Sequence, residues 1–325
     1  MPRYIPGVFS VPSPEGPVVV TPGNVYWVDM VNGVDANDGK TPAKAVKKIS
    51  TAYGHCTANQ NDVVAVIANA SGTAAAAGGS ATAETAALTW EKSFTHLIGM
   101  CSPVPFSQRV RLTTSTASLS PFVTISANGC IFSNIQFSNN HSHATAGAVC
   151  AKVTGARNYF ENCHFQGIGA LGVVDNSHRS IVIESSDAEN KFKSCTFGTD
   201  TVDGVTATNY VMEFSGTGGT ARNQFEDCIW LGNGSANSSF ILATEVSSLS
   251  SFQIFKDCLF LNNDNGTMDP MTQGFALHAD NGGLFIFKDC MVYGAATLET
   301  TNTGKILVRN APAAATGDIA IAATF

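Results

Sequence analysis

The stretch NYFENCHF, residues 158–165, recurs along the second half of the chain and decides the fold. Related stretches follow it at regular intervals: NKFKSCTF (190–197), NQFEDCIW (223–230), IFKDCLF (254–260) and IFKDCMV (286–292). With the earlier member Phe132-Ile135-Phe137, a Phe-x-x-(Cys/Ile)-x-(aromatic or aliphatic) motif occurs six times. The leading residues, 28 to 33 positions apart, are Phe132, Phe160, Phe192, Phe225, Phe255 and Phe287. A period of about 30 residues indicates a repeat architecture.

Each repeat contains two short strand-like segments and no helical pattern. The cysteine and the aromatic residue two positions later alternate with a period of two, which predicts a strand with both side chains on one face. A second β-rich segment precedes each motif, at Val123–Ile125, Val149–Val153, Ile181–Ile183, Val211–Phe214, Phe240–Leu242 and Phe275–Leu277. Short strands repeated in one direction predict an all-β solenoid of about nine coils, with equivalent strands stacked in parallel about 4.8 Å apart.

Stacking turns repeated residues into files along the solenoid. The cysteines should form an interior file beside files of Phe, and we interpret them as core residues. A metal or redox ladder is the alternative, but it needs thiolates, which an apolar interior disfavours. The nine cysteines contain no C-x-x-C pair, so they indicate neither a disulfide framework nor a zinc site. Charged residues beside the core positions are expected to form outward pairs of mixed sign: Glu161, Lys193, Glu226, Asp227, Lys256, Asp257, Lys288 and Asp289.

A cap should cover the open N-terminal end of the solenoid, because an exposed sheet edge invites aggregation. Residues 40–53 are predicted to be helical, with Thr41-Pro42 as the start signal. One face of this helix would carry Ala45, Ile49, Ala52 and Tyr53. Further strands are expected at Asp62–Ile67, Thr95–Met100, Arg109–Leu112, Ile306–Val308 and Ile319–Ile321. The chain is therefore divided into an extended arm (1–23), a cap (24–60) and the β-helix with its closing strands (61–325).

The arm is rich in proline, with six of the 12 prolines in the first 22 residues. Proline fixes the backbone in an extended form and withholds a hydrogen-bond donor. The arm is either a loose leader or a segment that packs on a neighbouring subunit. Apolar residues favour the second interpretation, and those expected to contact the partner are Tyr4, Ile5, Val8, Phe9 and Val11.

Composition narrows the functional classes. The 325 residues carry 18 Lys and Arg against 25 Asp and Glu, which gives a net charge of −7. This balance argues against a nucleic-acid partner, because such surfaces need clustered basic residues. Hydrophobic residues make up 44%, enough for a large core, which excludes a disordered chain. No apolar run is long enough to span a membrane, and the start lacks the apolar stretch of a secretory signal.

The sequence resembles the right-handed parallel β-helix, or pectate-lyase-like, superfamily over about residues 24–310. The resemblance rests on the six Phe/Cys coils and on three N-terminal stretches, YWVDMVNGVDANDGKTPAKAVKKISTAY (26–53), NDVVAVIA (61–68) and ALTWEKSFTHLIGM (87–100). The NxFexCxF coils look more like virion proteins of tailed bacteriophages than like secreted plant-cell-wall enzymes. The resemblance therefore implies a parallel β-helix with a short capping helix, and a phage virion protein.

Enzymes of this superfamily carry recognisable groups, and none of the expected sets occurs in the sequence. The galacturonase-like set, the calcium-binding aspartates with an arginine base and the esterase-type Gln-Asp-Thr-Leu are all missing. Glycoside hydrolysis needs two carboxyl groups about 5–9.5 Å apart, which stacked coils could supply. The candidates are Glu184, Asp187, Glu189 and Glu213, or Asp200 with Asp203. We interpret these acids as solvated turn residues.

Three other polar groups were considered as sites. His141-Ser-His143 could place two imidazoles on one strand face, but two ligands without a third make a weak metal site. The segment 35–39 is interpreted as a turn, since Val46 stands where a calcium loop needs Glu. His178-Arg179 has no partner that the sequence identifies. We therefore expect no catalytic, metal-binding or cofactor-binding residues, no cofactor and no enzymatic activity.

These observations predict a phage structural protein that decorates or cements the capsid exterior of the virion, made in the cytoplasm of the bacterial host. Its expected partners are the major capsid protein and itself, as a homotrimer, with no nucleic acid and no membrane. The alternative is a tailspike or tail fibre that binds or cleaves host-surface polysaccharide. Ring-stacking aromatics on an outer face would favour that alternative, whereas most aromatics are placed inward. A secreted adhesin is a third interpretation, disfavoured by the missing signal.

Overall fold

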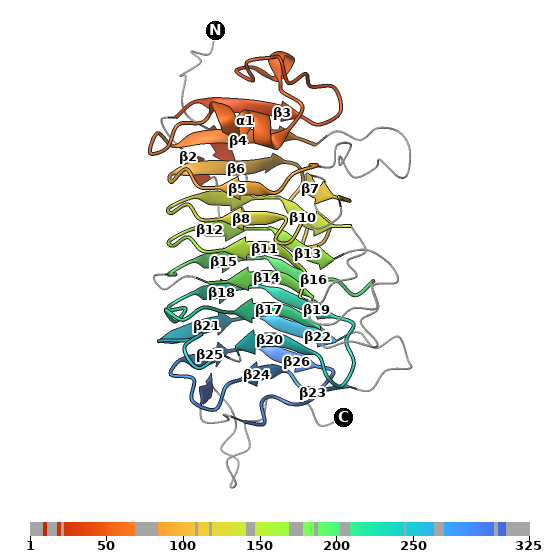
Figure 1. Ribbon diagram of the computed structural model, residues 1–325, viewed down its shortest axis with the longest axis vertical. Coiled ribbons are helices and arrows are strands. Elements are labelled where there is room, and N and C mark those ends of the chain that lie inside the picture. The colour runs from red at the N-terminus through yellow and green to blue at the C-terminus, as the bar shows by residue number, and fades with distance from the viewer. Residues whose placement is uncertain are drawn as a thin grey trace.

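The computed structural model describes residues 9–11, 18–20, 23–68, 84–107, 110–116, 119–140, 147–168, 178–184, 188–201, 209–243, 245–262, 270–301 and 305–309. Its main body is a stack of coils along one long axis (Figure 1). The chain passes through three parallel sheets in turn, which confirms the predicted parallel β-helix.

The three sheets differ in length. Sheet I has ten strands: β3 (Val25–Asp29), β4 (Asp62–Ile67), β6 (Thr95–Met100), β9 (Ile131–Ser133), β12 (Tyr159–Glu161), β15 (Lys191–Lys193), β18 (Gln224–Glu226), β21 (Phe252–Lys256), β25 (Leu284–Lys288) and β28 (Ile306–Arg309). Sheet II has seven: β7 (Arg111–Thr114), β10 (Gln136–Asn139), β13 (His164–Ile168), β16 (Thr196–Gly198), β19 (Ile229–Gly232), β22 (Leu259–Asn262) and β26 (Met291–Tyr293). Sheet III also has seven: β5 (Leu88–Trp90), β8 (Val123–Ile125), β11 (Val149–Val153), β14 (Arg179–Ile183), β17 (Tyr210–Phe214), β20 (Ser239–Ala243) and β24 (Phe275–Leu277).

Within the described part of the chain, six coils have a strand in all three sheets, from β7–β8–β9 to β22–β24–β25. This is fewer than the nine coils expected from the sequence. The difference arises at the ends, where β3 and β4 pair in sheet I with a helical segment between them. Two short strands, β23 (Met271–Gln273) and β27 (Ala295–Thr297), form a separate pair near the last coils.

Aromatic side chains fill the interior in stacked files. In sheet I the rings of Phe160 and Phe192 lie 4.5 Å apart between centroids, with planes 5° apart. Sheet II carries a parallel file through Phe165 and Phe197, whose centroids are 5.5 Å apart. Rings of the two files meet edge-on, as Phe192 and Phe197 do at 66°, which is a favourable geometry for aromatic pairs. The in-register stacking predicted from the repeat is therefore confirmed.

The Phe-x-x-Cys-x-Phe motif forms a corner between two sheets, which the sequence analysis did not predict, while its Cys-x-Phe part leads into the sheet II strand with both side chains in the core, as expected. The cysteine lies just before the sheet II strand, and the residue before it turns the backbone into the left-handed region. These corner residues have φ between 49° and 58° and are Asn134, Asn162, Ser194, Asp227, Asp257 and Asp289. Asn and Asp tolerate this conformation better than other side chains with a Cβ. The corner thus explains why the motif carries small polar residues there.

The cysteines form the predicted interior file. The Sγ atom of each motif cysteine donates to main-chain carbonyls of its own and the preceding coil, as Cys195 does to Lys193 O at 3.4 Å and Phe160 O at 3.5 Å. All nine cysteines are free thiols. Burial raises the pKa of Cys150 to about 12 and raises the pKa values of Cys195 and Cys228 well above the ordinary range. These thiols are therefore protonated core residues, as expected.

A buried ladder of amide side chains marks the corner between sheets III and I. Asn158 Oδ1 accepts from Cys130 N at 2.8 Å, and Asn190 Oδ1 accepts from Asn158 N at 2.8 Å. The pattern continues through Asn223, which accepts from Asn190 N at 3.0 Å, and Gln253, which accepts from Asn223 N at 3.2 Å. Each amide therefore satisfies a buried backbone N–H of the preceding coil.

The predicted helix over 40–53 is split. A 3-10 turn spans Pro42–Lys44, and the α-helix α1 spans only Ile49–His55. Between them the chain is extended, because Val46 forms a bridge to Val28 and its backbone bonds to Trp27 O and Asp29 N. This bridge covers part of the free edge of sheet I. The helix in this segment is shorter than predicted. Asp35 accepts from Lys47 N and Lys48 N, both at 3.0 Å, which agrees with its interpretation as a turn residue.

The ends of the chain are described in part. Strands β1 (Phe9–Val11) and β2 (Val18–Val20) pair antiparallel in a sheet of their own. At the other end β28 closes sheet I near its expected position, while Ile319–Ile321 lies outside the described residues. The helices among the described residues are all too short to cross a bilayer.

The predicted file of charged residues beside the motif is present in sheet I, but only some of these side chains are exposed to solvent. Glu161, Lys193, Glu226 and Lys256 lie side by side on adjacent strands of sheet I. Glu226 forms ion pairs with Lys256 and Lys191, and these two interactions lower the pKa of Glu226 to about 2. Glu161 and Lys193 are only 1% and 3% exposed, so their prediction as surface residues was wrong.

The connector between β6 and β7 covers the corner beside this buried pair. Pro105 O accepts from Thr196 Oγ1 at 2.6 Å, and Ser107 N donates to His164 Nδ1 at 3.2 Å. This segment returns from an N-terminal coil and crosses coils that follow it in sequence. This segment therefore lies beside the corner of the two coils that carry Glu161 and Lys193.

Candidate functional site

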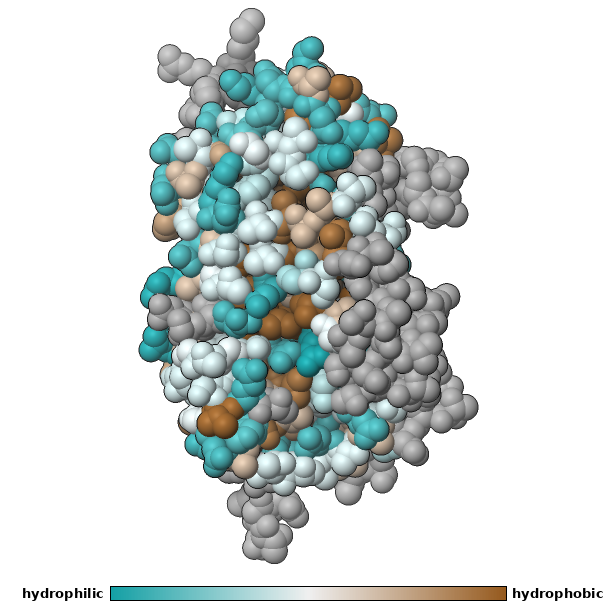
Figure 2. All heavy atoms as spheres, viewed as in Figure 1, coloured by the Kyte–Doolittle hydropathy of each residue, from teal (hydrophilic) through white to brown (hydrophobic). Residues whose placement is uncertain are grey.

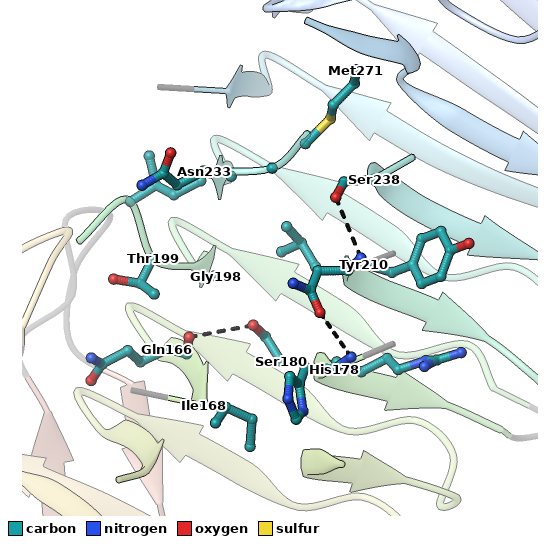
Figure 3. A pocket seen from close by; sticks show the side chains of 16 residues that line it. Gln166, Ile168, His178, Ser180, Gly198, Thr199, Tyr210, Asn233, Ser238 and Met271 are labelled. Atoms are coloured by element: carbon teal, nitrogen blue, oxygen red, sulfur yellow. Dashed lines mark hydrogen bonds between the residues drawn. The ribbon is translucent and has the colours of Figure 1, made fainter. Parts of the chain in front are cut away.

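A surface hollow lies where sheet II turns into sheet III. It holds about 80 Å³ and spans the coils of β13–β14, β16–β17 and β19–β20. One side is formed by the ends of sheet II strands and the other by the starts of sheet III strands. Figure 3 shows His178, Tyr210 and Ser238 at the starts of three successive strands, with Gln166, Thr199 and Asn233 across from them.

Glycines at the ends of the sheet II strands bring the two sides close together. Gly167 and Gly198 have φ of +89° and +85°, a region that residues with a Cβ rarely adopt. A Cβ on Gly167 would meet Ser180 Oγ at 2.3 Å, and one on Gly198 would meet Leu231 O at 2.1 Å. These positions therefore require glycine, and they fix the narrow base of the hollow.

A chain of polar contacts runs along the hollow from coil to coil. Asn209 Oδ1 accepts from His178 N at 3.1 Å, and Ser238 Oγ accepts from Asn209 N at 3.3 Å. Ser180 Oγ donates to Gln166 O across the hollow at 3.3 Å. Each contact is drawn in Figure 3. The residue before each sheet III strand is thus held in place and presents its remaining polar groups along one line.

An ion pair and an aromatic ring lie beside this line. Arg179 Nε is 2.5 Å from Glu213 Oε2, and the Arg179 guanidinium lies 5.2 Å from the centroid of the Tyr210 ring. Both charged side chains are largely shielded, with 14% and 17% exposed. Burial raises the pKa of Tyr210, so its hydroxyl stays protonated at neutral pH and can donate a hydrogen bond.

The side-chain oxygen of Asn233, in the lining of the hollow, has no hydrogen bond among the described residues. Asn233 is 5% exposed, and its Oδ1 accepts from no donor in that part of the chain. Its Nδ2 lies 3.5 Å from Asp200 O. A buried amide oxygen without a donor costs free energy, so this oxygen is ready to accept from a ligand hydroxyl or a water molecule.

The outer file of sheet III continues the surface beside the hollow. Lys152, Val182, Glu213 and Leu242 are in register on β11, β14, β17 and β20. The neighbours of these four residues within each strand belong to the interior core cluster, whereas Val182 and Leu242 do not. The four residues therefore lie on the outer face of sheet III. Figure 2 shows hydrophobic residues along the middle of this otherwise polar face, where sheet III runs in Figure 1. The surface therefore mixes apolar and charged groups next to the polar line.

The carboxylates considered from the sequence are engaged in ion pairs between coils. Glu184 contacts Lys152 at 2.6 Å, Glu189 contacts Arg157 and Arg222 at 2.9 Å each, and Glu213 contacts Arg179. Asp187 and Asp203 lie outside the described residues, as do His141 and His143. Asp200 supplies a main-chain carbonyl near Asn233. No Asp or Glu lines the hollow among the residues described there.

The other predictions have mixed outcomes. His178-Arg179, which had no identifiable partner in the sequence, lines the hollow and pairs with Glu213. Of the arm residues, Phe9 and Val11 lie in β1, whereas Tyr4, Ile5 and Val8 are outside the described residues. Within the described part of the chain, no group of three or more His, Cys, Asp or Glu side chains could hold a metal ion.

Comparisons with known proteins place the fold. No protein family and no curated protein matches the sequence. Solved structures do match: a rhamnogalacturonan lyase is 14% identical with a TM-score of 0.55, over 83% of this chain and 68% of its own. Pectate lyase Pel9A is 12% identical with a TM-score of 0.58, over 89% and 68%. The fold is therefore the pectate-lyase-like right-handed parallel β-helix, as the sequence resemblance implied.

A phage protein is also among the solved structures that match. ORF18 of Geobacillus virus E2 is 10% identical over 94% of this chain and 66% of its own, with a TM-score of 0.40. That score is too low to carry an argument about function. It is a further example of a protein to which this β-helix is similar.

The comparisons correct the expectation that the chain is not an enzyme. The two solved structures described above with TM-scores over 0.5 are both lyases, so the fold is one that supports catalysis. The absence of known catalytic motifs from the sequence did not justify the expectation of no enzymatic activity. The hollow brings together side chains from coils about 30 residues apart. No short motif can display such a set. Likeness at this level of identity shows the fold alone and assigns no reaction.

Proposed function

We propose that this chain is a bacteriophage virion protein that engages a host-surface polysaccharide along the hollow between sheets II and III. The observation that carries the proposal is the line of His178, Asn209 and Ser238 on successive coils. At about 4.8 Å per coil this line spans about 10 Å, the scale of a disaccharide, and it runs along the axis of the solenoid. An extended polymer fits this shape better than a compact metabolite.

The chemistry of the lining suits a ligand rich in hydroxyl groups. Amide, hydroxyl and imidazole groups can each donate to or accept from a sugar hydroxyl. Ile168, Val211 and Met271 supply apolar contacts between these polar groups, a mixture typical of ligand sites. Tyr210 provides an aromatic residue on an outer face, which is the feature that favoured the tailspike or tail-fibre alternative. The lyases of similar fold are named for polysaccharides, which agrees with this class of ligand.

Binding to a panel of immobilised polysaccharides tests the proposal. The panel contains pectate, rhamnogalacturonan and purified bacterial capsular and O-antigen polysaccharides, and release of reducing ends is followed in parallel. Wild type should bind at least one polymer, and Tyr210→Ala should reduce that binding about tenfold, the loss of a ring contact and a hydrogen bond. Tyr293→Ala, on a 46% exposed tyrosine away from the hollow, is the matched control. Equal binding by wild type and Tyr210→Ala would refute the site.

Capsid decoration is a second candidate, favoured by the β1–β2 hairpin, which forms a sheet apart from the solenoid at the N-terminal arm. In that role the arm contacts the major capsid protein or a neighbouring copy in a homotrimer on the virion exterior. Quantitative mass spectrometry of purified virions separates the two roles through closed symmetry. On the order of hundreds of copies per particle supports decoration, whereas a few to roughly eighteen supports a tail spike or fibre.

A further inference from the structure

The positive charges at the hollow are already balanced by carboxylates of the chain. Among the described residues that line the hollow, Arg179 is the only Lys, Arg, Asp or Glu. Its Nε is 2.5 Å from Glu213 Oε2, and the two side chains are only 14% and 17% exposed. Lys152, on a neighbouring coil of sheet III, is paired in the same way with Glu184 at 2.6 Å. The described lining therefore presents a nearly neutral surface to a ligand.

This charge balance decides which ligands can bind favourably. Proteins hold carboxylate and phosphate groups mainly with charged donors, above all an available Arg. Releasing Arg179 for that purpose would leave Glu213 shielded from water and without its partner, which costs free energy. The whole chain also carries a net charge of −7, which repels a polyanion at long range. An uncharged sugar unit meets neither obstacle.

The lining also contains an acceptor that a sugar hydroxyl can satisfy. Asn233 is 5% exposed, and no described residue donates to its Oδ1. Its Nδ2 lies 3.5 Å from Asp200 O, so the donor side of the amide already faces a carbonyl. An amide oxygen accepts from O–H or N–H groups, whereas an ionised carboxylate has no proton to donate. Asn233 therefore favours a hydroxyl group and disfavours a carboxylate at the same place.

The next coil fixes the backbone beside Asn233. Asn262 Oδ1 accepts from Gly234 N at 2.9 Å, and Asn262 Nδ2 donates to Gly234 O at 3.0 Å. Figure 3 shows Asn233 across the hollow from Tyr210 and Ser238. The acceptor is thus held in place opposite the line of polar groups, and such preorganisation lowers the entropy cost of binding.

We infer that the hollow selects an uncharged sugar unit, and that Asn233 Oδ1 accepts a hydrogen bond from one of its hydroxyl groups. The inference rests on the proposed function and names the class of polysaccharide that this site takes. An acidic polymer such as pectate, for which one protein of similar fold is named, falls outside this class. The fold is shared with that protein, but the charges of the lining belong to this chain.

Matched pairs of polymers test the selection by charge. The panel polymer that binds wild type most tightly is oxidised at its primary hydroxyl groups to carboxylates or, if it is acidic, reduced at its carboxyl groups to alcohols. Dissociation constants are measured at pH 8, where imidazole side chains are ordinarily neutral. The neutral form should bind at least about tenfold more tightly than the carboxylated form. Raising NaCl from about 0.05 M to about 0.5 M should change its affinity less than about twofold, because screening acts on charges.

The outcomes of this experiment separate the inference from the proposed function. Tighter binding of the carboxylated form, still weakened about tenfold by Tyr210→Ala, would overturn the selection for uncharged units and keep the polysaccharide site. Equal binding of the two forms would overturn the selection as well. A wild-type protein that binds no polymer of the panel in either form would refute the proposed function and this inference with it.

Replacing Asn233 with leucine tests the acceptor. Asn233→Leu should weaken binding of the neutral polymer about tenfold, the loss of one hydrogen bond to a buried group. Its urea midpoint should stay at the wild-type value or rise, because the substitution removes a buried oxygen without a donor among the described residues. Asn281 is the matched control, because its Oδ1 accepts from Leu249 N at 3.1 Å, so Asn281→Leu should lower the urea midpoint. Unchanged binding by Asn233→Leu, or a fall in its urea midpoint like that of Asn281→Leu, would overturn the role of Asn233.

Discussion

Replacing Asn190 with alanine tests the amide ladder that joins successive coils at the corner of sheets III and I. Asn190 Oδ1 accepts from Asn158 N at 2.8 Å, and its Nδ2 donates to Gly155 O at 3.1 Å. Asn190 is 1% exposed and Asn158 is equally buried, so water cannot replace these bonds. The substitution leaves one N–H and one C=O without a partner at about 1–3 kcal/mol each. We expect a loss of roughly 2–6 kcal/mol, a large share of the total stability of a folded domain.

Urea unfolding followed by circular dichroism measures this loss, with hydrogen exchange at the Asn158 amide as a local readout. The matched control is Gln224→Ala, which removes a half-buried amide side chain from the outer face of sheet I. The control should change the free energy of unfolding by less than about 0.5 kcal/mol, as surface substitutions usually do. An Asn190→Ala protein as stable as this control, with an unchanged exchange rate at Asn158, would refute the reasoning about the ladder.

Three further predictions follow from the corners, the buried histidines and the thiols. Asp257→Val should destabilise by about 1–2 kcal/mol because φ is 52° there, and Asp257→Asn should not; equal urea midpoints would contradict this. Burial lowers the pKa values of His96 and His164 to about 4 from 6.5, so the unfolded state binds more protons between those pH values. Stability should therefore fall by up to roughly 3 kcal/mol per histidine as the pH drops from 6.5 to 4, and a flat urea midpoint across this range would exclude it. In the folded protein at pH 8, maleimide should label half-buried Cys101 before Cys195, and mass spectrometry showing equal rates would contradict a closed interior.

The repeat of the sequence predicted the interior of the fold because stacking converts a linear period into a spatial file. Phe160 and Phe192 are 32 residues apart and lie ring on ring, as the spacing required. The corner within the motif was not predicted, because only the Cys-x-Phe half was assigned to a strand and the leading Phe, which lies in a strand of sheet I, was not. Asn162 in NYFENCHF was the available signal, since Asn is common in that conformation.

The amide ladder could also have been found from the sequence. Asn158, Asn190 and Asn223 each stand two positions before the leading Phe of their motif, so a polar residue recurs at a position that the coil buries. The pattern was visible in the quoted stretches. A recurring polar residue does not by itself indicate burial, however, because polar residues recur at exposed positions of a repeat as well.

Most of the candidate site could not be predicted in this way. His178, Asn209 and Ser238 have different side chains and unequal spacings, so nothing in the sequence marks them as one line. The burial of Glu161 and Lys193 was equally hidden, because it accompanies a connector that returns from a distant coil. Local patterns report how a residue sits in its own strand. They do not report which segment later covers it.

The central claim is that the hollow between sheets II and III engages a polysaccharide. Hydrogen–deuterium exchange of the purified protein, with and without a polysaccharide that it binds, tests this claim most directly. The account predicts slower exchange at the backbone amides of residues 178–180, 209–211 and 238–240, with Tyr293 and the last strands of sheet II unchanged. Protection confined to sheet I or to the N-terminal arm, with unchanged exchange in those three segments, would contradict it.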